Sequence, residues 1–180
     1  MVCNCCKILL KEKLENAGIA VHEISLGKAR ITYDRASMSS DRLNHLLEKY
    51  GFGLLENKDD ILVAEIKVAV IELIHQLNNV NSIVRKSDYI VEKLGYSYPY
   101  LSKVFSEHEH QTLEKYMILQ KIERIKHLLD EDELSLSEIA YMMDYSSVQY
   151  LSNQFKKVTG ITVTQYKSGS EITTRGIDEL

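Results

Sequence analysis

Apolar residues recur at helical spacing near the C-terminal end of the chain. Ile139 and Met143 are four residues apart, and Leu151 and Phe155 repeat this spacing farther along. Spacings of three and four place side chains on one side of an α-helix. The pattern therefore predicts two short amphipathic helices, with Asp144 in the turn between them, a residue type that tolerates positive φ.

Polar residues at capping positions support both predicted helices. Ser135 followed by Glu138 is a capping-box pattern, in which each side chain accepts a hydrogen bond from an unpaired backbone N–H group of the other residue. Ser146 or Ser147 is suited to open the second helix as its N-cap. The sequence thus predicts a helix, a short turn and a second helix over this stretch.

The same pattern occurs earlier in the chain. A motif Tyr-Leu-Ser-x-x-Phe begins at Tyr100 and again at Tyr150, and 150 minus 100 gives a repeat of 50 residues. Gly95 takes the turn position of Asp144 at an offset of 49, so the second turn holds one inserted residue. A repeat of this length indicates one supersecondary unit used twice. Helix-turn-helix units of this kind are typical of DNA-binding modules.

A long helical pattern joins the two units. Within residues 112–130, Ile122, Ile125 and Leu129 fall on one side. At about 1.5 Å per residue, roughly 18 residues span about 27 Å, which is close to the ~34 Å between successive major-groove faces on one side of B-DNA. We therefore expect a rigid spacer that lets one chain occupy two adjacent grooves.

The second helix of each unit leaves a polar face opposite its apolar stripe. Gln149 and Asn153 carry amides suited to adenine N6 and N7. We expect the second unit to supply more direct base discrimination, and the first unit to rely on Lys103, Tyr98 and DNA shape. The residues predicted to face DNA are Tyr98, Pro99, Ser102, Lys103 and Ser106 in the first unit, and Gln149, Ser152, Asn153, Lys156 and Lys157 in the second.

The first 57 residues have a different pattern. They alternate helical and strand-like spacing in the order helix, strand, strand, helix, strand, which is a ferredoxin-like order without its first strand. The helices are predicted over residues 6–17 and 39–50, and the strands over residues 19–26, 29–33 and 52–55. With a boundary in the polar segment 57–60, we predict a small α+β unit (1–57), a helical domain (60–168) and a disordered tail (169–180).

Charge and hydropathy limit the functions that this chain can have. The chain has 180 residues, 44% of them hydrophobic, and a formal net charge of −4. Residues 81–180 hold 12 Lys and Arg against 15 Asp and Glu, a net charge of −3, so we expect weak non-specific DNA affinity with a modest salt dependence. Charged residues interrupt the most apolar stretch, residues 61–77, which predicts a buried helix rather than a membrane span. With no signal-peptide pattern, we expect a cytoplasmic protein.

All three cysteines lie within the first six residues, at Cys3, Cys5 and Cys6. The spacing of Cys3 and Cys6 before a helix resembles the metal loop of heavy-metal-associated domains, and two such thiolates would suit a soft ion such as Cu(I) or Zn(II). The alternatives are ordinary reduced thiols or a redox pair. A metal-handling or thiol-redox protein with the helical repeat as scaffold is therefore the alternative function. We recognise no set of nucleophile, base and oxyanion donors and expect no enzymatic activity.

Residues 135–167 resemble the signature of AraC/XylS-type transcription regulators, and with a weaker first half the resemblance covers residues 60–168. It implies a mainly α, seven-helix domain with two helix-turn-helix units joined by a linker helix, here preceded by the small, incomplete ferredoxin-like unit. The function implied is a sequence-specific regulator that binds double-stranded DNA, with RNA polymerase as a further partner. We expect residues 1–57 to act as a sensory, dimerising or partner-binding module. The base-reading positions of the family correspond to Pro99, Ser102, Lys103, Val148, Gln149, Ser152 and Asn153.

The chain departs from the family pattern at two places. Asp144 stands where the family has a turn glycine, and Glu107-His108-Glu109-His110 replaces the basic run that often follows the first recognition helix. The second departure predicts weaker phosphate attraction near the first unit. Tandem amphipathic helices alone would also fit a helical adaptor that binds no nucleic acid.

Overall fold

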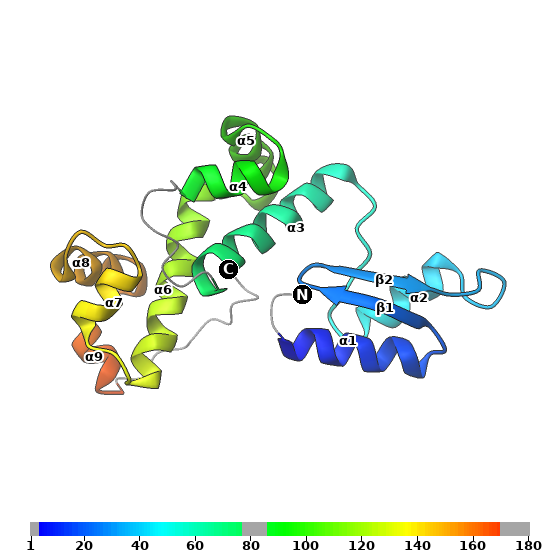
Figure 1. The fold of residues 1–180 in the computed structure, drawn as a ribbon, viewed down its shortest axis with the longest axis horizontal. Coiled ribbons are helices and arrows are strands. Elements are labelled where there is room, and N and C mark those ends of the chain that lie inside the picture. Colours follow the sequence, from blue (N-terminus) through cyan, green and yellow to red (C-terminus); the bar gives the residue numbers. More distant parts are fainter. Residues whose placement is uncertain (1–3, 77–85, 170–180) are drawn as a thin grey trace. The chain divides into compact units, whose positions relative to one another are not determined.

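The computed structural model describes residues 4–76 and 86–169, so Cys3, Leu77 and nearly all of the predicted tail lie outside the described residues (Figure 1). The chain divides into two compact units, Met1–Val68 and Ala69–Leu180. The division falls inside α3 (Lys58–Ile71). The domain boundary at residues 57–60 stays a prediction.

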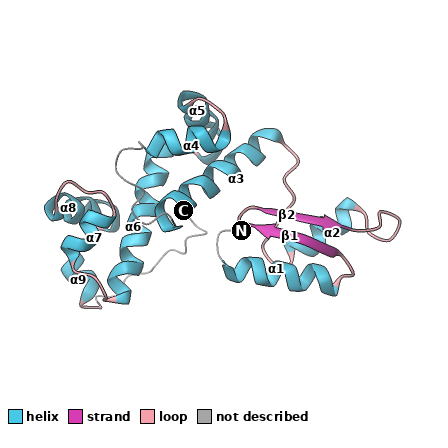
Figure 2. Ribbon diagram, viewed as in Figure 1, coloured by secondary structure: helices cyan, strands magenta, loops and turns pink. Residues whose placement is uncertain are grey.

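The N-terminal compact unit is a small α+β arrangement of two helices and a hairpin (Figure 2). Its two strands pair antiparallel, and Gly27 turns the hairpin with a φ of 73°. Apolar side chains from both helices meet beside the hairpin and form a core. The elements are α1 (Asn4–Asn16), β1 (Ala20–Ser25), β2 (Lys28–Thr32) and α2 (Ser40–Glu48), and the buried core residues are Leu10, Leu14, Ile19, Leu43 and Leu47.

The strand predicted over residues 52–55 is wrong, because this described segment forms no strand. Phe52 packs on the core of the N-terminal compact unit, whereas the backbone N–H of Leu54 donates a hydrogen bond to Asn44 Oδ1 on α2 at 3.0 Å. The segment therefore attaches to a helix side chain instead of the edge of the hairpin. Within the described residues the sheet has two strands, which does not complete the ferredoxin-like order.

The helical part of the chain contains the predicted seven helices among its described residues. α3 continues into a π-helical turn, η1 (Glu72–Gln76), and six helices follow. α6 runs through the middle of the C-terminal compact unit and contacts η1, α5, α7 and α8 (Figure 1). The six helices are α4 (Lys86–Leu94), α5 (Tyr98–Glu109), α6 (Leu113–Glu131), α7 (Leu136–Met142), α8 (Val148–Thr159) and α9 (Val163–Lys167).

The two helix-turn-helix units, α4–α5 and α7–α8, repeat each other in local detail. Ser97 and Ser147 are the N-caps of α5 and α8, and the turns before them place Gly95 at a φ of 74° and Asp144 at 55°. The predicted capping box at Ser135 is confirmed. The prediction that Asp144 adopts positive φ in place of glycine is also confirmed.

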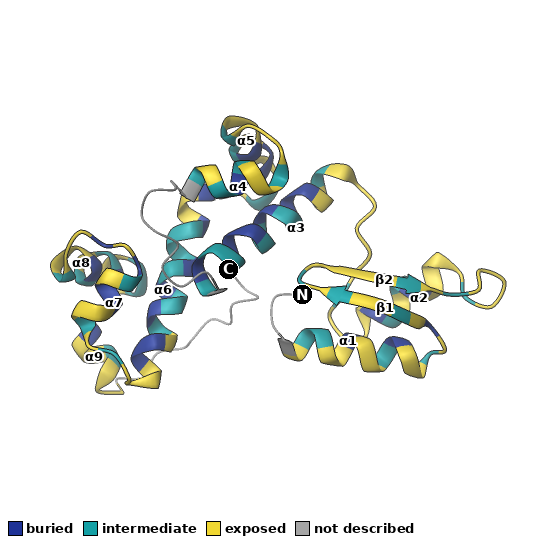
Figure 3. Cartoon of the chain, viewed as in Figure 1, coloured by how far each residue is buried: buried dark blue, intermediate teal, exposed yellow. Residues whose placement is uncertain are grey.

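Aromatic contacts repeat at the same offset and close each unit onto the helix that follows it. Phe105 packs against Tyr116 of α6 with ring centroids 5.2 Å apart, and Phe155 packs against Tyr166 of α9 at 5.6 Å. Buried positions lie on the inward faces of α5, α6 and α8 (Figure 3). The fully buried residues there include Leu101, Phe105, Ile122, Ile125, Leu151 and Phe155.

No helix among the described residues is both long and apolar enough to cross a membrane. The longest described helix, α6, carries charged residues along its length and packs inside the C-terminal compact unit.

Candidate DNA-binding surface

The exposed face of α8 displays the amides predicted to read bases. Gln149 and Asn153 are exposed, while Val148 and Ser152 are half-buried between them and the core. Gln149 Nε2 donates a hydrogen bond to Asn153 Oδ1 at 3.1 Å. This bond holds both amides on the same face of the helix. Because a solvent-exposed hydrogen bond contributes little net free energy, it can be replaced by hydrogen bonds to a base at little cost. The face can therefore present two amides to a major groove.

Lys156 and Lys157 extend this face toward the C-terminal end of α8. Both side chains are exposed, and among the described residues neither is paired with a carboxylate. A positive charge in the last turn is also favourable to the helix dipole. Lys167, by contrast, is ion-paired with Asp132 beyond the end of α6. Among the described residues of the second helix-turn-helix unit, the two α8 lysines thus remain available to phosphate.

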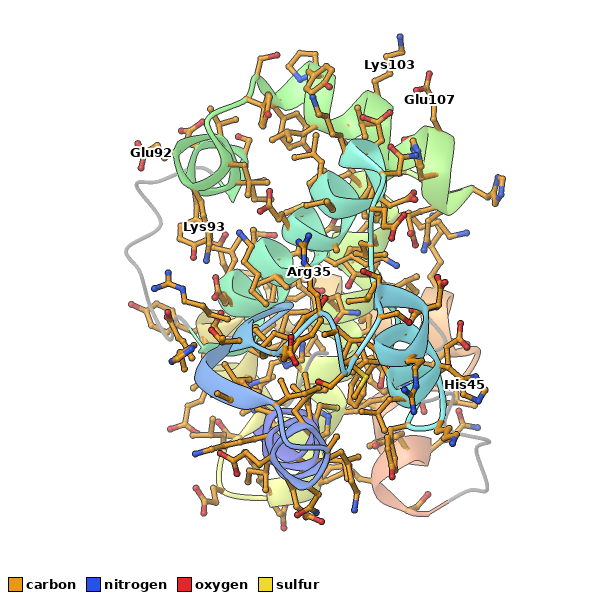
Figure 4. All side chains as sticks on the ribbon, turned by 90° about the vertical axis from the view of Figure 1, so that its right-hand side faces the viewer. Arg35, His45, Glu92, Lys93, Lys103 and Glu107 are labelled. Atoms are coloured by element: carbon orange, nitrogen blue, oxygen red, sulfur yellow. The ribbon has the colours of Figure 1, made fainter. Side chains whose placement is uncertain are left out.

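The corresponding face of α5 is arranged differently. Pro99 is exposed in the first turn of α5, and Ser102 is half-buried. Lys103 Nζ lies 3.9 Å from Glu107 Oε1, and both side chains project from the same side of the helix (Figure 4). The lysine predicted to contact DNA is therefore already partnered by an acid one turn away.

Tyr98 is turned toward the linker helix. Its hydroxyl donates a hydrogen bond to Glu114 Oε1 on α6 at 2.8 Å. Partial burial, together with the hydrogen bond and the charge of Glu114, raises the pKa of the Tyr98 hydroxyl. In the described structure Tyr98 anchors the start of α5 to α6, and its contact with DNA stays a prediction.

Equivalent positions of the two recognition helices differ in charge. At the offset of 50, Ser106 and Glu107 of α5 correspond to Lys156 and Lys157 of α8. The first pair carries a charge of −1 and the second a charge of +2, so the difference is three charges. Because these positions adjoin the base-reading face, α8 is the helix better suited to phosphate.

α6 holds both units at a fixed separation. Lys121 Nζ donates to the backbone oxygen of Met143 at 3.0 Å and lies 4.8 Å from the ring centroid of Tyr145, which ties α6 to the turn of the second unit. Glu114 ties it to the first unit through Tyr98. α6 has 19 residues, so it is about 28 Å long at ~1.5 Å per residue.

A buried polar contact also joins α6 to η1. Gln120 is fully buried, and its Oε1 lies 3.3 Å from His75 Nε2. Burial lowers the pKa of His75, a shift to which the nearby Arg124 and His127 contribute and which the bond to Gln120 opposes. His75 is therefore held in its neutral form at neutral pH.

Sequence reasoning named Glu107 in the acidic run that follows the first recognition helix, but it missed the ion pair of Glu107 with Lys103. It also missed two other residues that shape this surface. Glu114 and Lys121 act through contacts between residues 16 and 22 positions apart, with Tyr98 and Met143 respectively. No local pattern signals contacts of that kind.

The structure describes two of the three N-terminal cysteines: Cys5, which is exposed, and Cys6, which is half-buried, both in the first turn of α1. Cys3 lies outside the described residues. Among the described residues, no group of three or more His, Cys, Asp or Glu side chains is placed to hold a metal ion. A soft-metal site at Cys3 and Cys6 stays a prediction.

Comparison with known proteins addresses the helical half most directly. Residues 90–169 match the family described as "Helix-turn-helix domain". The chain is 27% identical over 184 aligned positions to the xylose operon regulatory protein of Escherichia coli K12, covering 92% of this chain and 47% of that protein. It is 26% identical over 122 positions to the Msm operon regulatory protein of Streptococcus mutans, covering 68% and 42%.

A solved structure of a xylose-binding transcription activator is also similar to this chain. Its TM-score is 0.45 at 21% sequence identity, and the match covers 92% of this chain and 37% of that one. The chain thus spans less than half the length of each of these proteins.

Proposed function

Since this chain carries an AraC-type helix-turn-helix domain and belongs to the DNA-binding transcription regulators of that type, we propose that α5 and α8 enter two successive major grooves on one face of the duplex. One observation carries this proposal: two equivalent recognition helices both pack against a single helix, α6. Its length of about 28 Å approaches the ~34 Å between successive grooves. Figure 1 shows both recognition helices nearly end-on, as two helices that enter parallel grooves would be.

Base discrimination is assigned mainly to α8. Gln149 and Asn153 can each form a bidentate contact with adenine N6 and N7 once their mutual hydrogen bond opens. Val148 offers an apolar contact for a thymine methyl group, and Ser152 a hydroxyl. On α5, Lys103 can contact guanine O6 and N7 when it leaves Glu107. Pro99 and Ser102 complete that face.

The phosphate contacts are unequal in the two grooves. Lys156 and Lys157 supply positive charge beside α8, whereas Glu107 supplies negative charge at the equivalent position of α5. We infer that α8 provides most of the electrostatic attraction, and that α5 docks because α6 places it over the next groove. The first unit then contributes specificity without much non-specific affinity.

The setting of this activity follows from the relatives and the composition. The names of the two regulatory proteins both refer to an operon, so we propose that this chain controls transcription of an operon in the cytoplasm and has no catalytic role. We further propose contact with RNA polymerase, and dimerisation through residues 1–57. The second idea is supported by the open strand edges of a two-stranded sheet.

Selection of bound sequences from a random duplex library tests the proposal. The full chain should enrich a motif of two elements about one helical turn, roughly 10 base pairs, apart. The double variant Gln149→Ala with Asn153→Ala should lose the preference in one element and keep it in the other. Ser137→Ala, an exposed change on α7, is the control and should leave the motif intact.

Absence of any enriched motif from the folded wild-type chain would refute the proposal. Loss of both elements in the α8 variant, with an unchanged circular dichroism spectrum, would refute the division of base reading between the two helices.

A further inference from the structure

The first residue of the repeated Tyr-Leu-Ser-x-x-Phe motif has no role in the core. The leucine and phenylalanine of both copies are fully buried. Tyr100 and Tyr150, however, have relative exposures of 43% and 54%. Packing therefore explains two of the repeated side chains but not the tyrosine. An aromatic ring exposed at the same place in both units is available for a contact with a molecule outside the chain.

Both tyrosine rings rest on another tyrosine. The Tyr100 ring centroid lies 5.4 Å from that of Tyr96, and the Tyr150 centroid lies 5.8 Å from that of Tyr145. Tyr145 is itself fixed, because its hydroxyl donates to Gln154 Oε1 and its ring lies under Lys121. These contacts restrict the exposed rings, so little side-chain entropy remains to be lost when a ligand binds them.

The hydroxyl groups of these two rings are unused. Among the described residues, neither Tyr100 nor Tyr150 has a hydrogen-bond partner for its hydroxyl. Other tyrosines of the same unit are satisfied: Tyr98 donates to Glu114, and Tyr166 donates to Asp130. Tyr100 and Tyr150 thus each present a fixed ring with a free O–H donor.

Their place on the helices defines what this donor can reach. Both tyrosines are the third residue of a recognition helix, since α5 begins at Tyr98 and α8 at Val148. Residues three apart are neighbours on a helix surface, so Tyr100 adjoins Lys103 and Tyr150 adjoins Asn153. The hydroxyls therefore lie at the edge of each base-reading face, near a helix N-terminus, where the dipole favours an anion.

On the basis of the proposed function, we propose that Tyr100 and Tyr150 each donate a hydrogen bond to a DNA phosphate at the rim of the groove that their own helix enters. Tyrosine hydroxyls and helix N-termini are common donors to phosphate, and such contacts fix the depth and register of a recognition helix. Two equivalent donors at the same offset anchor both helices in the same way. The base amides and Lys103 then meet their base edges in register.

Tyrosine-to-phenylalanine changes isolate the hydroxyl and leave the ring pairs in place. Tyr100→Phe and Tyr150→Phe are compared with Tyr141→Phe, which changes a tyrosine on α7 that is 78% exposed and belongs to no repeat motif. Each variant is titrated against a duplex selected by the wild-type chain and against single-base variants of that duplex. We expect each motif variant to bind roughly three- to tenfold more weakly, the size of one solvent-exposed hydrogen bond. The ranking of the duplexes should not change.

Duplexes with one uncharged methylphosphonate locate the phosphate. Substitution at one position near the α8 element should weaken wild-type binding and should have no further effect on Tyr150→Phe. A different position, near the α5 element, should show the same dependence on Tyr100. Thermal unfolding of the free proteins should be unchanged, because the hydroxyls make no contact within the described fold.

Two results would overturn the inference while leaving the proposed function intact. One is wild-type affinity in both motif variants. The other is a weaker variant whose loss persists at every methylphosphonate position or changes the preferred base. If the wild-type chain selects no duplex, the proposed function fails and this inference fails with it.

Discussion

Reversing the charge of Glu107 tests whether the two recognition helices differ in phosphate attraction. Glu107 occupies the position in α5 that Lys157 occupies in α8. Its ion pair with Lys103 spans 3.9 Å between side chains with relative exposures of 59% and 71%. A pair this exposed contributes about 0.3–0.5 kcal/mol. Glu107→Lys therefore costs the fold little, and it releases Lys103 and adds a second cation beside the groove.

The expected size of the effect follows from counterion release. One added phosphate contact steepens the slope of log K against log salt by about 0.9, so between about 50 and 200 mM salt the advantage of the variant should fall about 3.5-fold. Lys157→Glu should make the slope shallower by a similar amount. Glu107→Gln should raise affinity while changing the slope less, because it removes an acid without adding a contact. Fluorescence anisotropy titrations of a selected duplex at four or five salt concentrations measure these slopes.

Glu133→Lys is the matched control for this experiment. It makes the same change in net charge at an exposed residue between α6 and α7, outside both recognition helices. If Glu133→Lys and Glu107→Lys steepen the slope equally, the effect comes from net charge alone and the assignment of position 107 to the groove is refuted.

Three further predictions concern stability. Because burial lowers the pKa of His75, the unfolded chain binds a proton more readily than the folded chain. The free energy of unfolding should therefore fall as the pH is lowered from 7.5 to 5.5. In urea titrations His75→Gln should reduce this pH dependence, whereas the control His110→Asn, at an exposed position, should not. Gly95→Ala should destabilise the helical domain by about 1 kcal/mol through its positive φ alone, since nothing lies within 4 Å of an added Cβ, whereas Gly95→Asn should cost less in thermal unfolding. Leu151→Ala, at a fully buried position, should cost about 3–5 kcal/mol in the same assay, and a loss below about 1 kcal/mol would contradict the core assignment.

Much of the helical domain could be predicted because its signals are local. The capping box at Ser135, the apolar spacing of α8 and the turn residue Asp144 all act within a few positions, and the structure confirms each of them. The repeat adds a second copy of the same local signals. The linker helix follows from a long stretch of helical periodicity that no proline or glycine interrupts.

The parts that could not be predicted depend on distant partners. A strand needs an edge to pair with, and Phe52 instead packs on the core while Asn44 takes the next available backbone N–H group. The helix predicted over residues 61–77 gives no sign of its π-helical end, η1. The turning of Tyr98 toward Glu114 likewise depends on where α6 lies, which the sequence of α5 does not encode.

The central claim is that one chain reads two adjacent groove segments through helices held at a fixed separation by α6. Its most direct test is the affinity of the full chain for a selected duplex with zero, five or ten base pairs inserted between the two elements. A rigid spacer predicts that both insertions reduce binding to the level of a duplex with a single element. Recovery of full affinity at ten base pairs would contradict the claim, because α6 could not bridge the added turn.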